Sequence, residues 1–160
     1  MSRLVPGLLV ACVLGAALGC ASAKLKILQP VVRPSQITLV VKRGPHLTVS
    51  GKRLRALRKL VNESLSADGL HIVDHLGPGV AQVVGTIERD DPGNRTVRLF
   101  FGFLGFGGGE FASNWALSTP EGDPTGECEV RGSVYVAGDY DDVLKAAMHR
   151  VSECLLAPNR

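Results

Sequence analysis

The stretch Ala81-Gln-Val-Val-Gly-Thr-Ile-Glu-Arg89 decides the fold, because its side chains alternate in character from one position to the next. Ala81, Val83, Gly85 and Ile87 fall on one side of an extended chain, and the polar side chains fall largely on the other. This alternation is typical of a strand that buries one side and leaves the other in solvent. The segment therefore predicts a half-buried strand.

Further strands are expected on both sides of this one. Ile37 to Val41 is a short β-branched run, and His71 to Val73 is a second short candidate. Toward the C-terminus, two more alternating runs place these residues on one face: Phe111, Ser113, Trp115 and Leu117, then Cys128, Val130, Gly132, Val134 and Val136. Turn-forming residues separate the runs. Neighbouring strands joined by short turns indicate antiparallel pairing.

Two helices complete the predicted domain. Between about Lys52 and Ala67, an apolar stripe has helical spacing, and Thr48 or Ser50 can cap its start. A second stripe, beginning near Asp139 or Asp141, consists of Leu144, Met148, Val151 and Leu155. Residues 37–157 therefore predict one α+β domain in the order β-α-β-β-β-β-α. We expect a mostly antiparallel sheet of about five strands, with both helices packed on one face.

The N-terminal region predicts export and lipid attachment. Arg3 supplies a positive start, and Leu4 to Gly19 is wholly uncharged, which is the pattern of a secretory signal over residues 1–19. The end of this run, Ala17-Leu-Gly-Cys20, resembles a bacterial lipobox, which implies cleavage before Cys20 and lipid on that cysteine. The alternatives are an ordinary secreted protein and an uncleaved anchor. Residues 20–36, rich in Pro and Lys, are expected to form a tether.

Cysteine usage agrees with an oxidising compartment. Cys12 would leave with the signal segment, and Cys20 would carry lipid, so Cys128 and Cys154 remain as an even pair. Both fall on core-facing sides, one on the last strand and one on the last helix. A disulfide between them is favoured over two buried thiols.

Several short motifs together resemble a known family. They are Val83–Glu88, Asp91-Pro-Gly-Asn-Arg95, Phe101-Gly-Phe103, Phe106-Gly-Gly-Gly109 and the closing Tyr140-Asp-Asp-Val-Leu-Lys145. The order resembles bacterial envelope lipoproteins of the domain of unknown function 4410. That family is similar in layout to the N-terminal domain of TolB, the curli-export lipoprotein and a penicillin-binding-protein activator lipoprotein. The resemblance implies a non-enzymatic accessory domain, and it supplies no catalytic residues.

The glycine-rich segment 99–109 is the first candidate binding surface, with Phe100, Phe101, Phe103 and Phe106. A phosphate-binding loop is excluded because Glu110 and a strand follow the glycines, where Lys and a helix are required. Two alternatives remain. The favoured one is a glycine-kinked strand or hairpin packed on the core, and the other is an exposed loop that contacts a partner or a bilayer.

Basic residues in the first helix are the second candidate. Arg53, Arg55, Arg58 and Lys59 form either a patch for anionic lipid, cell-wall polymer or an acidic partner, or a solvated face. His71 and His75 lie on a short strand and loop, where surface histidines are expected rather than a metal site. A net charge of +3 and an aromatic content of 5% do not favour nucleic-acid binding.

The sequence as a whole predicts a lipid-anchored, non-catalytic accessory lipoprotein of the bacterial envelope that contacts another envelope protein or the cell wall. Ala21 after the cysteine, in place of Asp, resembles sorting to the outer membrane, with the domain facing the periplasm. We expect no cofactor and no metal. The alternative is a carrier of a small ligand or lipid that uses segment 99–109 as a pocket wall.

Overall fold

The computed structural model describes residues 21–29, 33–104, 106–135 and 138–156, apart from the side chain of Phe103. The predicted signal segment and Cys20 lie outside these residues, as does Val136. The elements are β1 (Ser22–Gln29), β2 (Gln36–Arg43), α2 (Gly51–Ala67), β3 (His71–Ile72), β4 (Val80–Asp91), α3 (Arg95–Phe101), the 3₁₀ turn η1 (Gly102–Leu104), β5 (Gly109–Ser118), β6 (Pro124–Val134) and α4 (Tyr140–Leu156).

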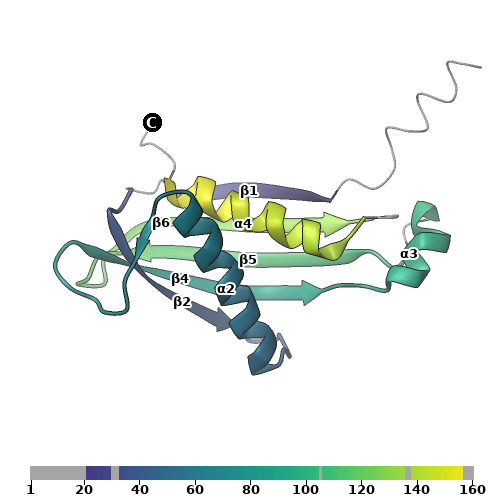
Figure 1. The fold of residues 1–160 in the computed structure, drawn as a ribbon, viewed down its shortest axis with the longest axis horizontal. Coiled ribbons are helices and arrows are strands. Elements are labelled where there is room, and N and C mark those ends of the chain that lie inside the picture. The colour runs from purple at the N-terminus through teal and green to yellow at the C-terminus, as the bar shows by residue number, and fades with distance from the viewer. Residues whose placement is uncertain (1–20, 30–32, 105, 136–137, 157–160) are drawn as a thin grey trace, which may run out of the picture.

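The strands form one mixed sheet in the order β1-β6-β5-β4-β2-β3 (Figure 1). Strands β1, β6, β5 and β4 pair antiparallel, as predicted, whereas β2 pairs parallel with both β4 and β3. The prediction of a mostly antiparallel sheet of five strands is therefore only roughly right. The parallel pairs arise because α2 carries the chain back along the sheet between β2 and β3, and parallel neighbours need such a crossover.

Helices α2 and α4 cover the same face of the sheet (Figure 1). The predicted α2 stripe is buried at Leu57, Val61 and Leu65, and Ser50 caps the helix by accepting a hydrogen bond from the Arg53 N–H. The alternating strand positions are confirmed as well, since the side chains of Val83, Ile87, Phe111, Trp115, Leu117, Cys128, Val130 and Val134 belong to the same core. The α+β class with one covered sheet face is therefore correct.

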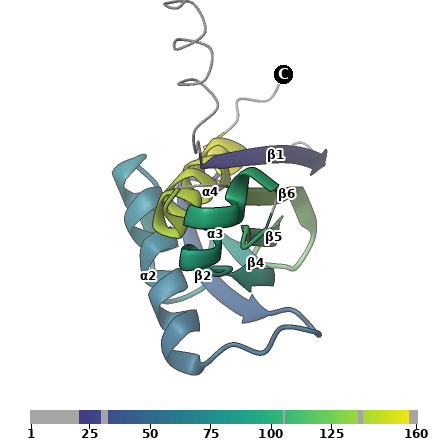
Figure 2. The ribbon, with the colours of Figure 1, turned by 90° about the vertical axis from the view of Figure 1, so that its right-hand side faces the viewer.

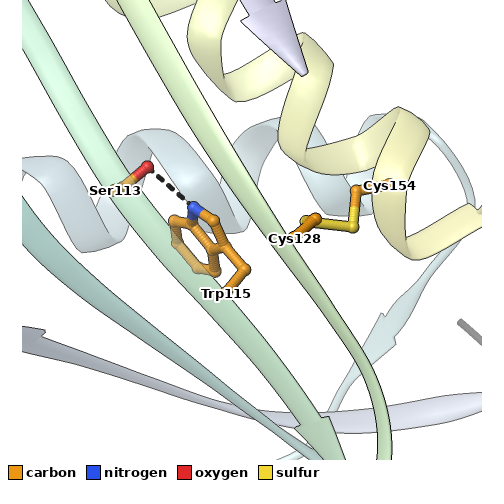
Figure 3. Close-up of a disulfide and its surroundings, with 4 residues drawn as sticks. All are labelled: Ser113, Trp115, Cys128 and Cys154. Carbon is orange, nitrogen blue, oxygen red and sulfur yellow. Dashed lines mark hydrogen bonds between the residues drawn. A yellow bond between two sulfur atoms is a disulfide. The ribbon is translucent and has the colours of Figure 1, made fainter. Parts of the chain in front are cut away.

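Trp115 and a disulfide occupy the middle of this core (Figure 3). The indole N–H of Trp115 donates a hydrogen bond of 2.8 Å to the Ser113 hydroxyl, which satisfies a buried polar atom. A Cβ at position 85 would overlap the Trp115 ring, so this strand position requires glycine. Cys128 and Cys154 form the predicted disulfide, and both are fully buried.

The first strand contradicts the expected tether. Residues 22–29 pair with β6 as an edge strand, and only part of 20–36 can act as a linker. Ala23 and Leu25 are half-buried against the core, while Lys24 and Lys26 are exposed. The sequence contains this alternation of apolar residues with lysines, but lysines followed by prolines suit a solvated linker equally well. Pairing with β6, a contact distant in the chain, decides between the two.

A third helix replaces the predicted glycine-kinked strand or hairpin. α3 begins after Asn94, whose side-chain oxygen accepts a hydrogen bond of 3.0 Å from the Val97 N–H. This is a normal N-terminal cap. α3 connects the end of β4 to the start of β5 and projects beyond the sheet (Figures 1 and 2).

The start of β1 lies at the same end of the sheet as α3, and we call this end the α3 end. Asp91 is aligned with Glu110, Glu110 with Ser133, and Ser133 with Ser22. The turn between β3 and β4 lies at the opposite end, because Gln36 is aligned with both His71 and Val80. The start of the N-terminal edge strand and the third helix therefore lie at the same end of the sheet, with β6 and β5 between β1 and β4.

Candidate functional site

Five exposed apolar side chains gather on α3, η1 and the residue that begins the return to β5. Leu99 is 56% exposed, Phe100 68% and Phe101 53%, while Leu104 and Phe106 are 58% and 59% exposed. We call these five residues the α3 patch. The favoured interpretation of the segment as core is wrong for Phe100, Phe101 and Phe106. The side chain of Phe103 lies outside the described part.

Helix α3 is inverted relative to an ordinary surface helix. Its buried residue is Arg98, which is 2% exposed, while the apolar Leu99, Phe100 and Phe101 face outward. Surface helices normally direct their apolar stripe to the core and their charges to water. The arrangement of α3 thus exposes apolar area that a water-facing helix would bury.

Arg98 holds α3 in place from beneath. Its guanidinium donates hydrogen bonds to the backbone oxygens of Pro92 and Gly107, which lie on the two chain segments that flank α3. Gly107 has a φ of +73°, and a Cβ there would overlap the Asn94 carbonyl and the Arg98 N–H. The glycine therefore permits the returning chain to pass directly against α3. These contacts make the α3 patch a supported projection of the fold.

Beside α3, three polar side chains connect three elements. Arg53 of α2 forms two hydrogen bonds with the Asp90 carboxylate of β4, at 2.7 and 2.8 Å. Tyr140, at the start of α4, donates a hydrogen bond of 2.8 Å to the same carboxylate. The Arg53 guanidinium also lies 6.0 Å from the centre of the Tyr140 ring. We call these residues the Asp90 cluster.

The charges in the Asp90 cluster stabilise one another. Burial alone would raise the pKa of Asp90, but hydrogen bonds from Arg53 and Tyr140 outweigh it and hold the pKa below its ordinary value. Burial and the neighbouring Asp90 charge raise the pKa of Tyr140 far above its ordinary value, so the phenol stays protonated. The Asp90 side chain is only 3% exposed, and the cluster acts as a structural link rather than as an acid or base. The sequence carried no signal for it, because the three residues are far apart in the chain.

A basic groove lies at the β2–β3 edge of the sheet, opposite the β1 edge. Its volume is about 430 Å³, and its lining includes Arg55, Arg58 and Lys59 of α2 together with Leu39 and Ile72. Asn62 and Asp74 complete the lining. The three basic side chains are exposed, and Lys59 has only a distant ion pair of 3.6 Å with Glu63. Arg53, which the sequence grouped with them, is instead held in the Asp90 cluster.

The uncovered sheet face contains another hollow, of about 450 Å³, near the α3 end. Its charged residues include Lys24, Arg89 and Arg131, and Arg89 pairs with Glu110. None of the three Phe side chains of the α3 patch lines this hollow or the basic groove. The structure therefore does not join the predicted Phe surface to the predicted basic surface.

The two candidate histidines lie on the surface. His71 and His75 are both exposed, and the part of the chain that the structure describes contains no group of three or more His, Cys, Asp or Glu residues able to hold a metal ion. Among the same residues, no helix has the length and apolar character needed to cross a membrane.

Comparison with known proteins gives information on the fold alone. No family model matches the chain, and no curated protein sequence matches it. The fold is similar to that of the PelC chain, whose structure from Paraburkholderia phytofirmans is a dodecamer. The solved structure of a singly substituted PelC has 11% identity and a TM-score of 0.57, covering 88% of this chain and 100% of that one. A structure of unsubstituted PelC has 12% identity and the same TM-score, covering 86% and 99%. At this identity, the likeness shows a shared fold alone.

Proposed function

We propose that this protein is a lipid-anchored, non-catalytic module of the bacterial envelope that binds an acidic face of another envelope protein through the basic groove. The observation that carries the proposal is the position of this groove. It lies at the β2–β3 edge of the sheet, whereas the strand that follows Cys20 is the opposite edge. A domain held at its β1 edge would keep the basic groove free for a partner.

The lining of the basic groove favours a protein partner over a cell-wall polymer. Buried Leu39 and half-buried Ile72 supply an apolar floor, and Arg55, Arg58 and Lys59 supply a charged rim. An apolar centre with a polar rim is the usual anatomy of a protein interface, in which arginine is enriched. A purely anionic polymer would need the charges and not the floor.

Charge reversal in the groove tests this proposal. We expect Arg55→Glu with Arg58→Glu to reduce recovery of a crosslinked partner from native cells by roughly tenfold or more, because two attractive contacts become repulsive. The matched control, Lys42→Glu with Lys145→Glu, makes the same change in net charge at exposed sites outside the groove and should leave recovery unchanged. Equal recovery from both variants would count against the groove. Loss of binding to isolated cell wall instead would indicate the polymer.

Lipid attachment at Cys20 has a test of its own. We expect radiolabelled palmitate to enter the protein and the Cys20→Ala variant to lose both the label and its membrane association. A labelled Cys20→Ala variant, or a wild-type protein without label in the membrane fraction, would contradict the anchor. The likeness to envelope lipoproteins of the domain of unknown function 4410, and the outer-membrane position, remain predictions beside it.

Self-association is the second candidate. Both PelC structures are dodecamers, and β1 is an edge strand whose outer side has no strand partner among the described residues. Such an edge can pair with another chain. Light scattering on the purified protein would support this candidate with a mass of several copies, and a monomer at micromolar concentration would count against it. The ligand-carrier alternative lacks comparable support, since no described hollow is lined by the α3 patch side chains.

A further inference from the structure

The α3 patch and the N-terminal attachment lie at the same end of the molecule. Cys20 precedes Ser22 by two residues, and a chain of two residues spans at most about 7 Å. Ser22 is aligned with Ser133, and Ser133 with Glu110 at the start of β5. Two strand spacings, about 10 Å, therefore separate the start of β1 from the chain that leads out of the α3 patch. In Figure 2, which views the molecule from this end, α3 faces the reader and β1 lies above it.

Exposed apolar residues are also concentrated at the α3 end of the molecule. In the part of the chain that the structure describes, nine large hydrophobic side chains are exposed, and five of them make up the α3 patch. A sixth, Tyr135, follows directly after β6, whose last residue is aligned with the first residue of β5. Scattered exposed side chains are normal, whereas five of them within residues 99–106 concentrate apolar surface of the kind that marks an interaction site.

We infer that the α3 patch inserts into the surface of the bilayer that holds the N-terminus, so that the domain makes a second membrane contact beside its anchor. The inference rests on the proposed function only for the N-terminal attachment. A covalent lipid at Cys20 and a retained apolar leader, Leu4 to Gly19, would both bring the bilayer to the α3 end. The inverted helix fits this position, because its outward residues are apolar and its charged residue, Arg98, is held inside.

The chemistry of the α3 patch specifies the kind of lipid surface. Its five side chains carry no charge, and exposed Arg95 of α3 lines a hollow together with exposed Asp139. Insertion should therefore depend on apolar burial rather than on anionic headgroups, and it should be insensitive to salt. The orientation also follows. With the α3 end in the interface, the β3–β4 turn and Leu76 point away from the membrane.

Fluorescence quenching tests the inference on the full chain. Purified protein is incorporated into phosphatidylcholine vesicles whose acyl chains carry a nitroxide, and variants with one added tryptophan are compared. The native Trp115 is 1% exposed and provides the same background in every variant. We expect emission of the added indole in Phe100→Trp to fall by roughly half in labelled vesicles, because the side chain enters the upper acyl region. Leu104→Trp is a second probe in case the first variant misfolds.

Leu76→Trp is the matched control. Leu76 is 48% exposed, similar to the α3 patch residues, but it lies at the opposite end of the sheet. It should show no quenching beyond the parent protein. Equal quenching at positions 100, 104 and 76 would overturn the inference, as would an unquenched, blue-shifted signal at 100 and 104, which would mean that protein covers the patch.

The N-terminal attachment and the α3 contact can fail separately. If the protein does not float with vesicles, the proposed N-terminal attachment is wrong. If it floats but the probes at 100 and 104 are not quenched, the attachment stands and the α3 contact is wrong.

Discussion

At the scale of single residues, polar side chains inside the fold define how the elements meet. Arg98 holds the base of α3 through backbone oxygens, and Asp90 accepts hydrogen bonds from two other elements. Ser113 accepts the Trp115 N–H in the core. Each of these contacts satisfies a group that would otherwise be buried at a cost. The strongest stability effects of polar substitutions are therefore expected at Asp90 and Arg98.

Asp90→Asn should destabilise the protein in a pH-dependent way. At about pH 7 we expect a loss of about 2 to 3 kcal/mol in the free energy of unfolding, because a buried charge-assisted pair is lost and Arg53, a third exposed, keeps part of its hydration. The pKa of Asp90 is lowered from 3.8 in the folded protein, so its ionised form stabilises the fold above that pH. This contribution disappears as the pH falls through the lower folded pKa.

Denaturant titrations of wild type and variant check this prediction. The difference between the two proteins should be full at about pH 7 and smaller at about pH 3, because the Asp90 carboxyl of the unfolded chain, with a pKa of about 3.8, is then largely protonated and must lose that proton on folding. A difference that is the same at both pH values would mean that the amide change acts through packing and not through charge. Tyr140→Phe serves as a milder control, since it removes the hydroxyl's hydrogen bonds to the Asp90 carboxylate and the Glu110 backbone oxygen and leaves the Arg53 pair in place.

At the scale of elements, the layers are joined by covalent and steric contacts. The disulfide connects β6 to α4 (Figure 3). Trp115 packs over Gly85 of the neighbouring strand. Gly132 of β6 likewise lies against Val143 of α4, where a Cβ would overlap the side chain. The small residues at these points let a strand and its cover approach closely. The sheet and α4 therefore behave as one packed unit.

Removing the disulfide should lower stability without changing the fold. For the Cys128→Ala and Cys154→Ala double variant, we expect a loss of roughly 3 kcal/mol, because the closed loop of 26 residues no longer restricts the unfolded chain. Thermal unfolding followed by circular dichroism measures the change. Reductant should shift the wild-type transition in the same direction and leave that of the double variant in place. A double variant as stable as the wild type would contradict this role.

At the scale of the whole molecule, the sheet separates two surfaces. The start of β1 and the α3 patch share one end, while the basic groove lies at the β2–β3 edge. A domain held at the start of its β1 edge would present the basic groove to the surrounding compartment. This geometry follows from the strand order, because β1 pairs with β6 and leaves β2 and β3 at the far edge.

The incorporation of β1 into the sheet has a direct test. Amide hydrogen exchange of a peptide covering residues 22–29 should be slowed at the alternate amides that face β6, because the strand pairs with β6 on one side and is an edge on the other. The exposed turn around Gly77 to Gly79 supplies the rapidly exchanging reference. Exchange of 22–29 as fast as this turn would restore the tether that the sequence predicted.

The local features were determined by the sequence itself. Alternation of side chains placed Val83, Ile87 and Trp115 on the buried face, and the stripe with Leu57 and Val61 placed α2, because burial of apolar area acts through a short, regular period. The positions of Cys128 and Cys154 on core-facing sides also followed from these periods.

Only the tertiary structure decided which of these pieces meet. The parallel pairing of β2, the place of β1 beside β6, and the Asp90 cluster depend on contacts between residues distant in the chain, which no local period encodes. The same holds for α3. Its phenylalanines are typical core residues by composition, and they are exposed because Arg98 and the glycines on either side occupy the inner position instead.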